Sequence, residues 1–463
     1  MPFGLVSSEQ IDDYWSQNTR RKIFYAYPNG TAPLTGLLSM MENETTPQPS
    51  FGWNEERWTE TSTKAAVNPT SAANKDGPFA LTGTTTAAGD TNGKFTVAQF
   101  GAVRVYVVDS SMFQVNDTVK LFGVGFTTGA GPAATGSVDV SGRVTGTGTG
   151  YLELEATTAR TGVLNAAVTN GKSVVLIGTA YAEGARTGTG GIVFPYEILN
   201  NTQIFKTPYE MTRTALKEPL RYDKTGAYKD MSKSNGIKHL ASIERAAFFG
   251  EQAKTTTVDP DTGQTVPRRF TGGLRWFLDS WEKGTNYGQP DVSAAASWQT
   301  TPNKRVIKLG GTTITKADFN LLMARLFERT NNTSWDKLCL CGPEYLAKVA
   351  DMFERQIQFN SLRDEGFDGF NFKLVRHLSN SGEVFYKQHP LFASSEMRNS
   401  AFYIDLGYVG YRPLADSDTD IQPMIQLPDA DKRKDQWLTE CGFEFRFPEA
   451  NLYVENLGGI TLT

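Results

Sequence analysis

One continuous stretch, residues 200–251, constrains the fold more than any other part of the sequence. It begins with an extended, Thr-rich segment over Asn200–Thr214 and passes through a charged, Gly-punctuated stretch. Apolar residues then recur at steps of three and four, which is the period of an α-helix. The apolar stripe is Ile237, Leu240, Ile243, Ala247 and Phe248, and the opposite side carries Lys238, Ser242, Arg245 and Glu251. The pattern predicts an extended segment that leads into an amphipathic helix.

The length and composition indicate a soluble globular protein with more than one domain. A chain of 463 residues is long enough for two or three domains, and 39% hydrophobic with 21% charged residues is ordinary. The net charge of −4 gives no support for a nucleic-acid-binding surface over the whole molecule. No apolar run reaches the roughly 18 residues of a membrane span, and the N-terminus lacks the pattern of a signal peptide. We therefore expect no membrane partner and a protein that stays where it is made.

Cysteine and histidine usage gives no sign of a metal site or a disulfide framework. The residues concerned are Cys339, Cys341 and Cys441, and His239, His377 and His389. An odd number of cysteines, two of them one residue apart, does not suit a disulfide framework. The alternation in KLCLCG predicts a buried strand, and the histidines are scattered without metal-ligand spacing. We expect no metal ligands and no cofactor.

The first 60 residues have the composition of an arm rather than of a domain. A short amphipathic helix is predicted over Ser8–Ser16, and turn residues and prolines follow it. Phe51, Trp53 and Trp58 then need a surface that buries them. The arm must therefore lie across another part of the protein or across another copy.

Residues 86–186 differ in composition from the rest of the chain. Glycine and threonine increase, charges become fewer, and short apolar runs alternate with Gly-rich turns. Several short strands at regular spacing predict a small β-barrel or sandwich. We interpret this segment as an inserted all-β domain.

The remaining sequence mixes helices and strands, which predicts the α+β class. A hairpin is expected after Glu251, and a loop-rich segment over Trp276–Ser297. One helix begins at Thr315, with Asp318 placed for a capping box, and a second begins at Pro343. Strands are predicted at Lys337–Cys341, Phe372–Arg376, Glu383–Lys387, Ala401–Leu406, Tyr408–Arg412 and around Phe443–Phe447.

Three local motifs have ordinary structural interpretations beside their chemical ones. AAVTNGKS at Ala166–Ser173 ends like a phosphate-binding loop, but an apolar strand follows where that loop needs a helix, which favours a hairpin turn. DPDTGQ at Asp259–Gln264 resembles part of a calcium loop but lacks its later ligands, which favours a β-turn. The acidic run at Asp416, Asp418 and Asp420 is typical of a solvated loop. With few histidines and no catalytic triad in view, we predict no catalytic residues and no enzyme activity.

Several segments together resemble tailed-bacteriophage major capsid proteins of the HK97 fold. The resemblance rests on NNTQIF, on the helix that ends in IERAAFFGE, on TGGLRWFL, and on the closing segments SAFYIDLGYVGYRPL and WLTECGFEFRFPEANLYVENLGG. It implies an α+β, HK97-like capsid fold with an N-arm, an E-loop, a spine-helix P-domain and an A-domain, to which the small all-β domain is added. The implied division is 1–60 N-terminal arm, 61–85 and 187–229 extended E-loop region, 86–186 inserted β-domain, 230–300 spine helix and P-domain, 301–425 axial A-domain and 426–463 returning C-terminal strands.

The resemblance also implies a function in assembly. Such a protein forms hexamers and pentamers of an icosahedral virion shell around double-stranded DNA, which it contacts non-specifically, and it is assembled in the host cytoplasm. The implied partners are other copies of the chain, a portal, a scaffolding protein and a cement or decoration protein. We expect scaffolding to be a separate protein, because no long charged helical segment precedes the arm. The expected interface residues are Trp53, Trp58, Ile204, Phe205, Tyr209, Arg213, Lys238, Arg245, Glu251, Arg268 and Arg269.

Two alternative functions stay open on the sequence. An encapsulin-type compartment shares the fold but holds protein cargo, and the closing segments favour a virus over it. A trimeric fibre or adhesin-like binding protein is suggested by the β-domain alone. Extraction of double-stranded DNA from particles distinguishes the first alternative, and particle size distinguishes the second.

Overall fold

The computed structural model describes most of the chain from residue 43 onward. The described residues are 43–56, 62–64, 79–81, 94–97, 102–127, 136–157, 160–165, 173–185, 195–217, 227–259, 262–285, 287, 292–293, 297–301, 303–328, 336–352, 357–361, 373–379, 381–394 and 396–461. The predicted helix at Ser8–Ser16, the arm up to residue 42, Trp58 and most of the AAVTNGKS motif lie outside them. The chain divides into two compact units, one formed by 1–55 with 196–463 and the other by 56–195.

The second unit is built of antiparallel strands. They are β2 (Ser62–Lys64), β3 (Phe79–Leu81), β4 (Lys94–Val97), β5 (Ala102–Tyr106), β6 (Asp117–Thr127), β7 (Gly136–Gly148), β8 (Tyr151–Ala156), β9 (Arg160–Asn165) and β10 (Ser173–Thr179). These nine strands form one sheet, in which β6 pairs with β7, β9 and β10. Alternating apolar residues such as Val119, Leu121, Leu152 and Leu154 form its core. Gly150, with a φ of +78°, closes the two-residue turn between β7 and β8.

The first unit contains helices and five of the six sheets found among the described residues. Its helices are α3 (Arg213–Lys217), α4 (Ala227–Phe249), α5 (Leu274–Glu282), α6 (Lys316–Phe327) and α7 (Pro343–Met352), with short 3-10 turns η2 (Pro390–Ala393), η3 (Leu406–Tyr408) and η4 (Pro448–Ala450). Its first strands are β1 (Ser50–Glu55), β11 (Tyr196–Asn201), β12 (Gln203–Thr212), β13 (Ala253–Val258), β14 (Thr265–Phe270), β15 (Val306–Lys308), β16 (Thr313–Thr315), β17 (Asp336–Cys341) and β18 (Ile357–Ser361). The others are β19 (Lys373–Ser379), β20 (Gly382–Gln388), β21 (Ala401–Ile404), β22 (Val409–Pro413), β23 (Asp420–Gln422), β24 (Lys432–Phe445), β25 (Leu452–Glu455) and β26 (Gly459–Thr461). The predicted α+β class is confirmed.

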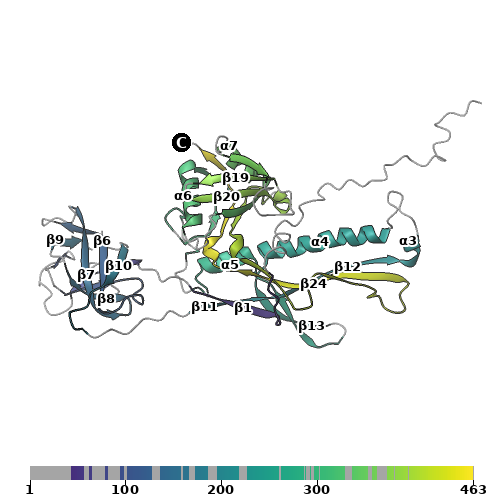
Figure 1. The fold of residues 1–463 in the computed structure, drawn as a ribbon, viewed down its shortest axis with the longest axis horizontal. Coiled ribbons are helices and arrows are strands. Elements are labelled where there is room, and N and C mark those ends of the chain that lie inside the picture. Colours follow the sequence, from purple (N-terminus) through teal and green to yellow (C-terminus); the bar gives the residue numbers. More distant parts are fainter. Residues whose placement is uncertain are drawn as a thin grey trace, which may run out of the picture. The chain divides into compact units, whose positions relative to one another are not determined.

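The long helix α4 runs alongside the long strands β12 and β24 (Figure 1). These two strands pair in antiparallel register along the whole of β12. Trp437 of β24 packs where α4 has Gly236: a Cβ on that glycine would lie 3.1 Å from the indole ring. The Trp437 indole N–H also donates to the Ser232 carbonyl at 3.1 Å. The helical glycine is therefore explained by the close approach of the strand.

The predicted apolar stripe of α4 is only partly correct. Ile243, Ala247 and Phe248 are buried, but Leu240 is 41% exposed. The polar residues His239 and Glu244 are buried in its place. The prediction was wrong for Leu240 because His239 and Glu244 both find hydrogen-bond partners on neighbouring elements. Apolar character alone therefore did not decide which residues of α4 are buried.

Residues 306–461 contain a seven-stranded mixed sheet flanked by α6 and α7. The predicted capping box of α6 is confirmed, since the Thr315 hydroxyl accepts from the Asp318 N–H and the Asp318 carboxylate accepts from the Thr315 N–H. The helix at Pro343 and the buried strand with Cys339 and Cys341 are also confirmed. The apolar residues of α6 and the central strands form one core.

Two expectations about local structure were wrong. The segment from Trp276 is not loop-rich at its start, because α5 occupies Leu274–Glu282 and buries Leu274, Phe277 and Trp281. These residues recur at steps of three and four, a signal that the preceding TGG turn obscured. The extended segment ends at Thr212 rather than Thr214, since α3 begins at Arg213.

Candidate functional site

The best-defined polar site of the first unit joins the N-terminal segment to the closing strands. We call it the arm junction: residues 43–55 with Asn200, Arg412, Glu444 and Arg446. The segment runs beside the end of β22, where the Thr46 N–H donates to the Pro413 carbonyl and the Ala415 N–H donates to the Thr46 carbonyl, both at 2.9 Å. It then forms β1, which pairs with β11 from Ser50 to Glu55. Because the chain leaves for the second unit after β1 and returns at β11, this pairing ties both connections to the first unit.

The inward side of β1 is held by aromatic packing. Phe51 and Trp53 alternate with exposed residues and are buried. The Trp53 ring lies 5.6 Å from the ring of Phe277 on α5, which in turn lies 5.7 Å from that of Phe445. Phe51 needs Gly442 beside it, because a Cβ there would lie 2.5 Å from the Phe51 ring. Phe51 and Trp53, two of the aromatic residues predicted to need a surface, therefore find one on their own chain.

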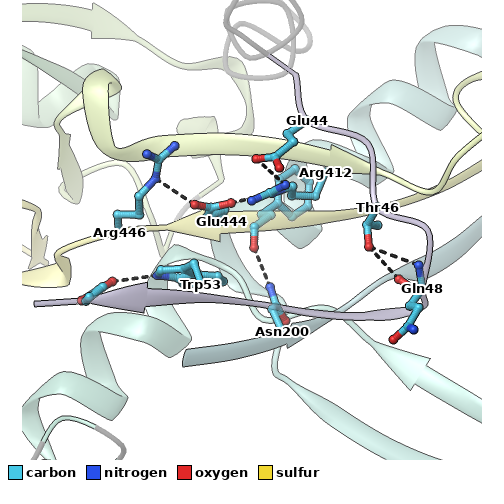
Figure 2. Close-up of polar contacts among 10 residues, drawn as sticks. Glu44, Thr46, Gln48, Trp53, Asn200, Arg412, Glu444 and Arg446 are labelled. Carbon is cyan, nitrogen blue, oxygen red and sulfur yellow. Dashed lines mark hydrogen bonds and ion pairs between the residues drawn. The ribbon is translucent and has the colours of Figure 1, made fainter. Parts of the chain in front are cut away.

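Glu55 connects the end of β1 to the last strands. Its Oε1 accepts a hydrogen bond from the Trp53 indole N–H at 2.8 Å (Figure 2). It accepts a second from the Phe447 backbone N–H at 3.0 Å. Phe447 has a φ of +46°, which is rare for a bulky residue. The carboxylate acceptor thus helps hold a backbone conformation that costs free energy on its own.

Asn200 is the most highly connected polar side chain of the junction. It is fully buried, and its Nδ2 donates to the carbonyls of Phe443 at 2.7 Å and Gly272 at 3.1 Å. Its Oδ1 accepts from the Gly272 and Asn201 N–H groups, each at 2.8 Å. One amide side chain therefore joins β11, the α4–α5 connection and β24, with donors and acceptors both satisfied.

Four charged side chains alternate in sign across the junction (Figure 2). Arg412 lies between Glu44, at 2.6 Å from its Nη1, and Glu444, at 2.5 Å from its Nε. The second oxygen of Glu444 is 2.8 Å from Nε of Arg446. Burial lowers the pKa of the Arg412 guanidinium, but its hydrogen bonds to and attraction by Glu444 and Glu44 outweigh burial, so that the pKa is raised. The nearly buried Glu444 is thus paired on both of its oxygens.

Two buried histidines fasten α4 to neighbouring elements. His389 accepts from the Leu391 N–H at Nδ1, so Nε2 carries the proton that it donates to Glu244 Oε1 at 2.8 Å. His239 lies between the Thr207 hydroxyl, 2.9 Å from Nδ1, and the Thr439 hydroxyl, 2.8 Å from Nε2. Burial lowers the pKa of His239, which favours the neutral ring.

The predicted interface residues divide into two groups. Trp53, Phe205 and Tyr209 are buried within the chain itself, so their burial needs no neighbouring copy. Ile204 is 55% exposed. The charged members of the predicted set lie on the surface: Arg213, Lys238, Arg245, Glu251 and Arg268 are exposed, and Arg269 is half-buried. None of these exposed residues belongs to the arm junction. The sequence analysis did not identify that junction.

The described residues offer no built site for chemistry. They contain no group of three or more His, Cys, Asp or Glu side chains placed to hold a metal ion. Strand β10 follows the AAVTNGKS motif, where a phosphate-binding loop needs a helix. In the Asp259–Gln264 segment the Gly263 N–H donates to the Asp259 carbonyl, as in a turn. All three cysteines are free and buried, and burial raises the pKa of Cys441 to about 12, which opposes thiolate reactivity.

Membrane insertion by a helix has no support in this fold. Across the described part of the chain, every helix is too short or too polar to cross a bilayer.

Comparison with protein families gives one match that spans nearly the whole chain. The family model of the SU10 major capsid protein matches residues 7–458. No curated protein sequence matches the chain.

Solved structures show weaker similarity. A structure from Mycobacterium phage Bobi is 6% identical, with 98% of this chain and 99% of that chain covered and a TM-score of 0.39. One from Mycobacterium phage Adephagia is 9% identical, with 99% of both chains covered and a TM-score of 0.37. The holo-SrpI encapsulin complex from Synechococcus elongatus is 9% identical over 57% of this chain and 77% of that chain, with a TM-score of 0.35. Because none of these scores reaches 0.5, the family assignment rests on the family model.

Proposed function

The chain belongs to the SU10 major capsid protein family, and from this membership we propose how it builds a shell. A major capsid protein is a structural protein of the virion, and it functions as a multimer of itself. The predicted assignment to a phage major capsid family is thereby confirmed. We propose further that the copies form hexamers and pentamers of a closed icosahedral head around double-stranded DNA. The match over residues 7–458 is the observation that carries this proposal.

The arm junction supports a role in which the N-terminal segment links neighbouring copies. The N-terminal segment and both connections to the second unit are fixed to the first unit by the β1–β11 pairing, Asn200 and the Arg412 charge cluster. An arm that contacts neighbouring copies can stabilise a shell only if its end is fixed to its own subunit. The contacts of residues 43–55 fix that end. From the structural role of the family, we also expect the protein to have no enzymatic activity.

The proposed partners follow from the shell. A portal, a separate scaffolding protein and a cement or decoration protein are expected in addition to other copies of the chain, with assembly in the host cytoplasm. DNA contact is expected to be non-specific and limited to local basic patches, since the net charge of −4 gives no support for a nucleic-acid-binding surface over the whole molecule.

Expression of the chain with and without its phage's scaffolding protein, followed by electron microscopy, tests the proposal. Closed, regular particles are expected in at least one case. DNA extracted from nuclease-treated virions distinguishes a head from a compartment with protein cargo. A chain that stays a soluble trimer or monomer under both conditions contradicts the proposed shell.

A further inference from the structure

The β13–β14 hairpin is an unusually exposed part of the first unit. Among the described residues its two strands pair only with each other, and most residues on both faces are exposed. Val258 is 63% exposed, and Val266 and Phe270 are each 37% exposed. A two-stranded hairpin is marginal in water unless something packs against it. The hairpin therefore has the properties of a segment that is covered in the assembled state.

The charged side chains on the two strands of the hairpin are all basic, whereas the turn between the strands carries Asp259 and Asp261. Its strands carry Lys254, Arg268 and Arg269 and no acidic residue. Lys254 and Arg269 are direct cross-strand partners, an arrangement that destabilises a sheet when nothing neutralises it. Within the described part of the chain, none of the three forms an ion pair, and Nε of Arg269 is buried without a hydrogen-bond partner. The basic side chains of the two strands are therefore without a carboxylate partner among the described residues.

A second surface of the same unit has the opposite character. The acidic loop, residues 415–431, carries Asp416, Asp418, Asp420, Asp429 and Asp431 and no basic residue. Asp431 pairs with Arg213, and Tyr411 donates to Asp418. Among the described residues, Asp416, Asp420 and Asp429 form no ion pair, and all three are exposed. The loop therefore offers carboxylates that are free to receive cations.

The acidic loop also exposes large apolar side chains. Met424 is 67% exposed, Leu427 is 72% exposed and Ile425 is 37% exposed. On the hairpin, Arg268 shares its face with Val266 and Phe270, because alternate residues and cross-strand partners lie on one side of a sheet. Each surface thus combines exposed apolar residues with charges, and the charges are opposite between the two. Such complementarity gives specificity to a protein contact.

We propose that the β13–β14 hairpin of one subunit docks on the acidic loop of a second copy of the chain. The contact rests on the proposed shell function and names one of the interfaces of that shell. It joins two different surfaces, so it is heterologous, and a heterologous contact that closes on itself generates a ring. Arg268 faces the carboxylates of the partner loop, while Val266 and Phe270 pack against its Met and Leu side chains.

Cross-linking in mixed particles tests the contact directly. Thr255, the cross-strand partner of Arg268, is replaced in one variant (Thr255→Cys) and Leu427 in another (Leu427→Cys). The native cysteines are buried, so a short bis-maleimide reacts at the introduced sites. Particles that contain both variants are expected to give a covalent dimer, and particles of either variant alone are not. A chain that carries both substitutions and cross-links only within itself overturns the second copy as the occupant.

Charge reversal gives an independent readout. Arg268→Glu and Asp429→Lys are each expected to lower the particle yield on the order of tenfold at 0.15 M salt, and the two together to restore most of it. Lys308→Glu, a reversal at an exposed lysine of β15 outside both surfaces, is the matched control and leaves the yield unchanged. Particles that form normally in both single variants and give no mixed dimer refute the contact but leave the shell function standing. Wild-type protein that forms no particle refutes both.

Discussion

The arm junction and the β13–β14 hairpin use similar side chains in opposite ways. In the junction, Arg412 and Glu444 are paired with each other and with further charges, and Asn200 satisfies both its donors and its acceptors. In the hairpin, Lys254 and Arg269 oppose each other across the strands, and neither forms an ion pair among the described residues. On the proposed contact, the junction stabilises the folded subunit and the hairpin contributes to assembly. Changes in the junction should therefore reduce the stability of the unassembled subunit, whereas changes in the hairpin should reduce only assembly.

The largest effect is expected from Asn200→Leu. The substitution leaves the Gly272 and Asn201 N–H groups and the Phe443 carbonyl buried without partners, which we expect to cost about 3–4 kcal/mol of unfolding free energy. Denaturant unfolding of the unassembled subunit measures the change. Asn54→Leu on the exposed side of β1 is the control, with an expected change within about 0.5 kcal/mol. Equal losses of unfolding free energy in Asn200→Leu and Asn54→Leu would show that the Asn200 hydrogen bonds do not stabilise the subunit.

Arg412→Leu should have the next largest effect. It removes the partner of one oxygen of the buried Glu444 and leaves Arg446 on the other. We expect a loss of about 2–4 kcal/mol of unfolding free energy, because breaking a buried ion pair is strongly destabilising. Arg213→Leu removes an arginine from an exposed pair with Asp431 and should cost about 0–1 kcal/mol. The same unfolding titration compares the two variants. If Arg412→Leu lowers the unfolding free energy no more than Arg213→Leu does, the Arg412 charge cluster is exposed to solvent.

Acid should destabilise the first unit through its buried histidines. Burial lowers the pKa of His377 to about 4, below its ordinary value near 6.5. The folded state thus favours the neutral ring, so this contribution is fully present above pH 6.5 and is lost as the pH falls from 6.5 toward 4. The loss is on the order of 2–3 kcal/mol. Unfolding curves of His377→Gln between pH 7 and 4 should be flatter than those of the wild type, and parallel curves would contradict a titrating His377.

The sequence predicted the elements of the first unit better than the contacts between them. The capping box at Thr315, the helix at Pro343 and the strand with Cys339 follow from local patterns and were confirmed. Asn200 was within the segment that the sequence singled out, yet its role depends on Gly272 and Phe443, far along the chain. Glu444 lies between two phenylalanines in the strand that was predicted around Phe443–Phe447. Its partner Arg412 is 32 positions away, a pairing that no local period reveals.

The burial of polar residues shows the same limit on α4. Periodicity placed Leu240 inside, but the sheet beside the helix presents the Thr207 and Thr439 hydroxyls, which suit His239. Whether a polar residue is inside depends on its partners, and these come from other elements. The domain boundaries, and the interface roles of the exposed residues Ile204, Lys238, Arg245 and Glu251, stay predictions.

The smallest effect on the subunit is expected from Leu427→Ser in the acidic loop. Because the side chain is 72% exposed, removal of its apolar surface should change the unfolding free energy of the unassembled subunit by less than about 0.5 kcal/mol. Leu278→Ser on α5 is the buried control, and the cavity and the buried hydroxyl should cost more than about 3 kcal/mol there. If Leu427 packs against the hairpin of a second copy, the same variant should still lower particle yield and salt resistance. If Leu427→Ser lowers the unfolding free energy of the unassembled subunit, Leu427 instead makes a contact within its own chain. The contrast between contacts of the folded subunit and contacts of assembly would then not hold for Leu427.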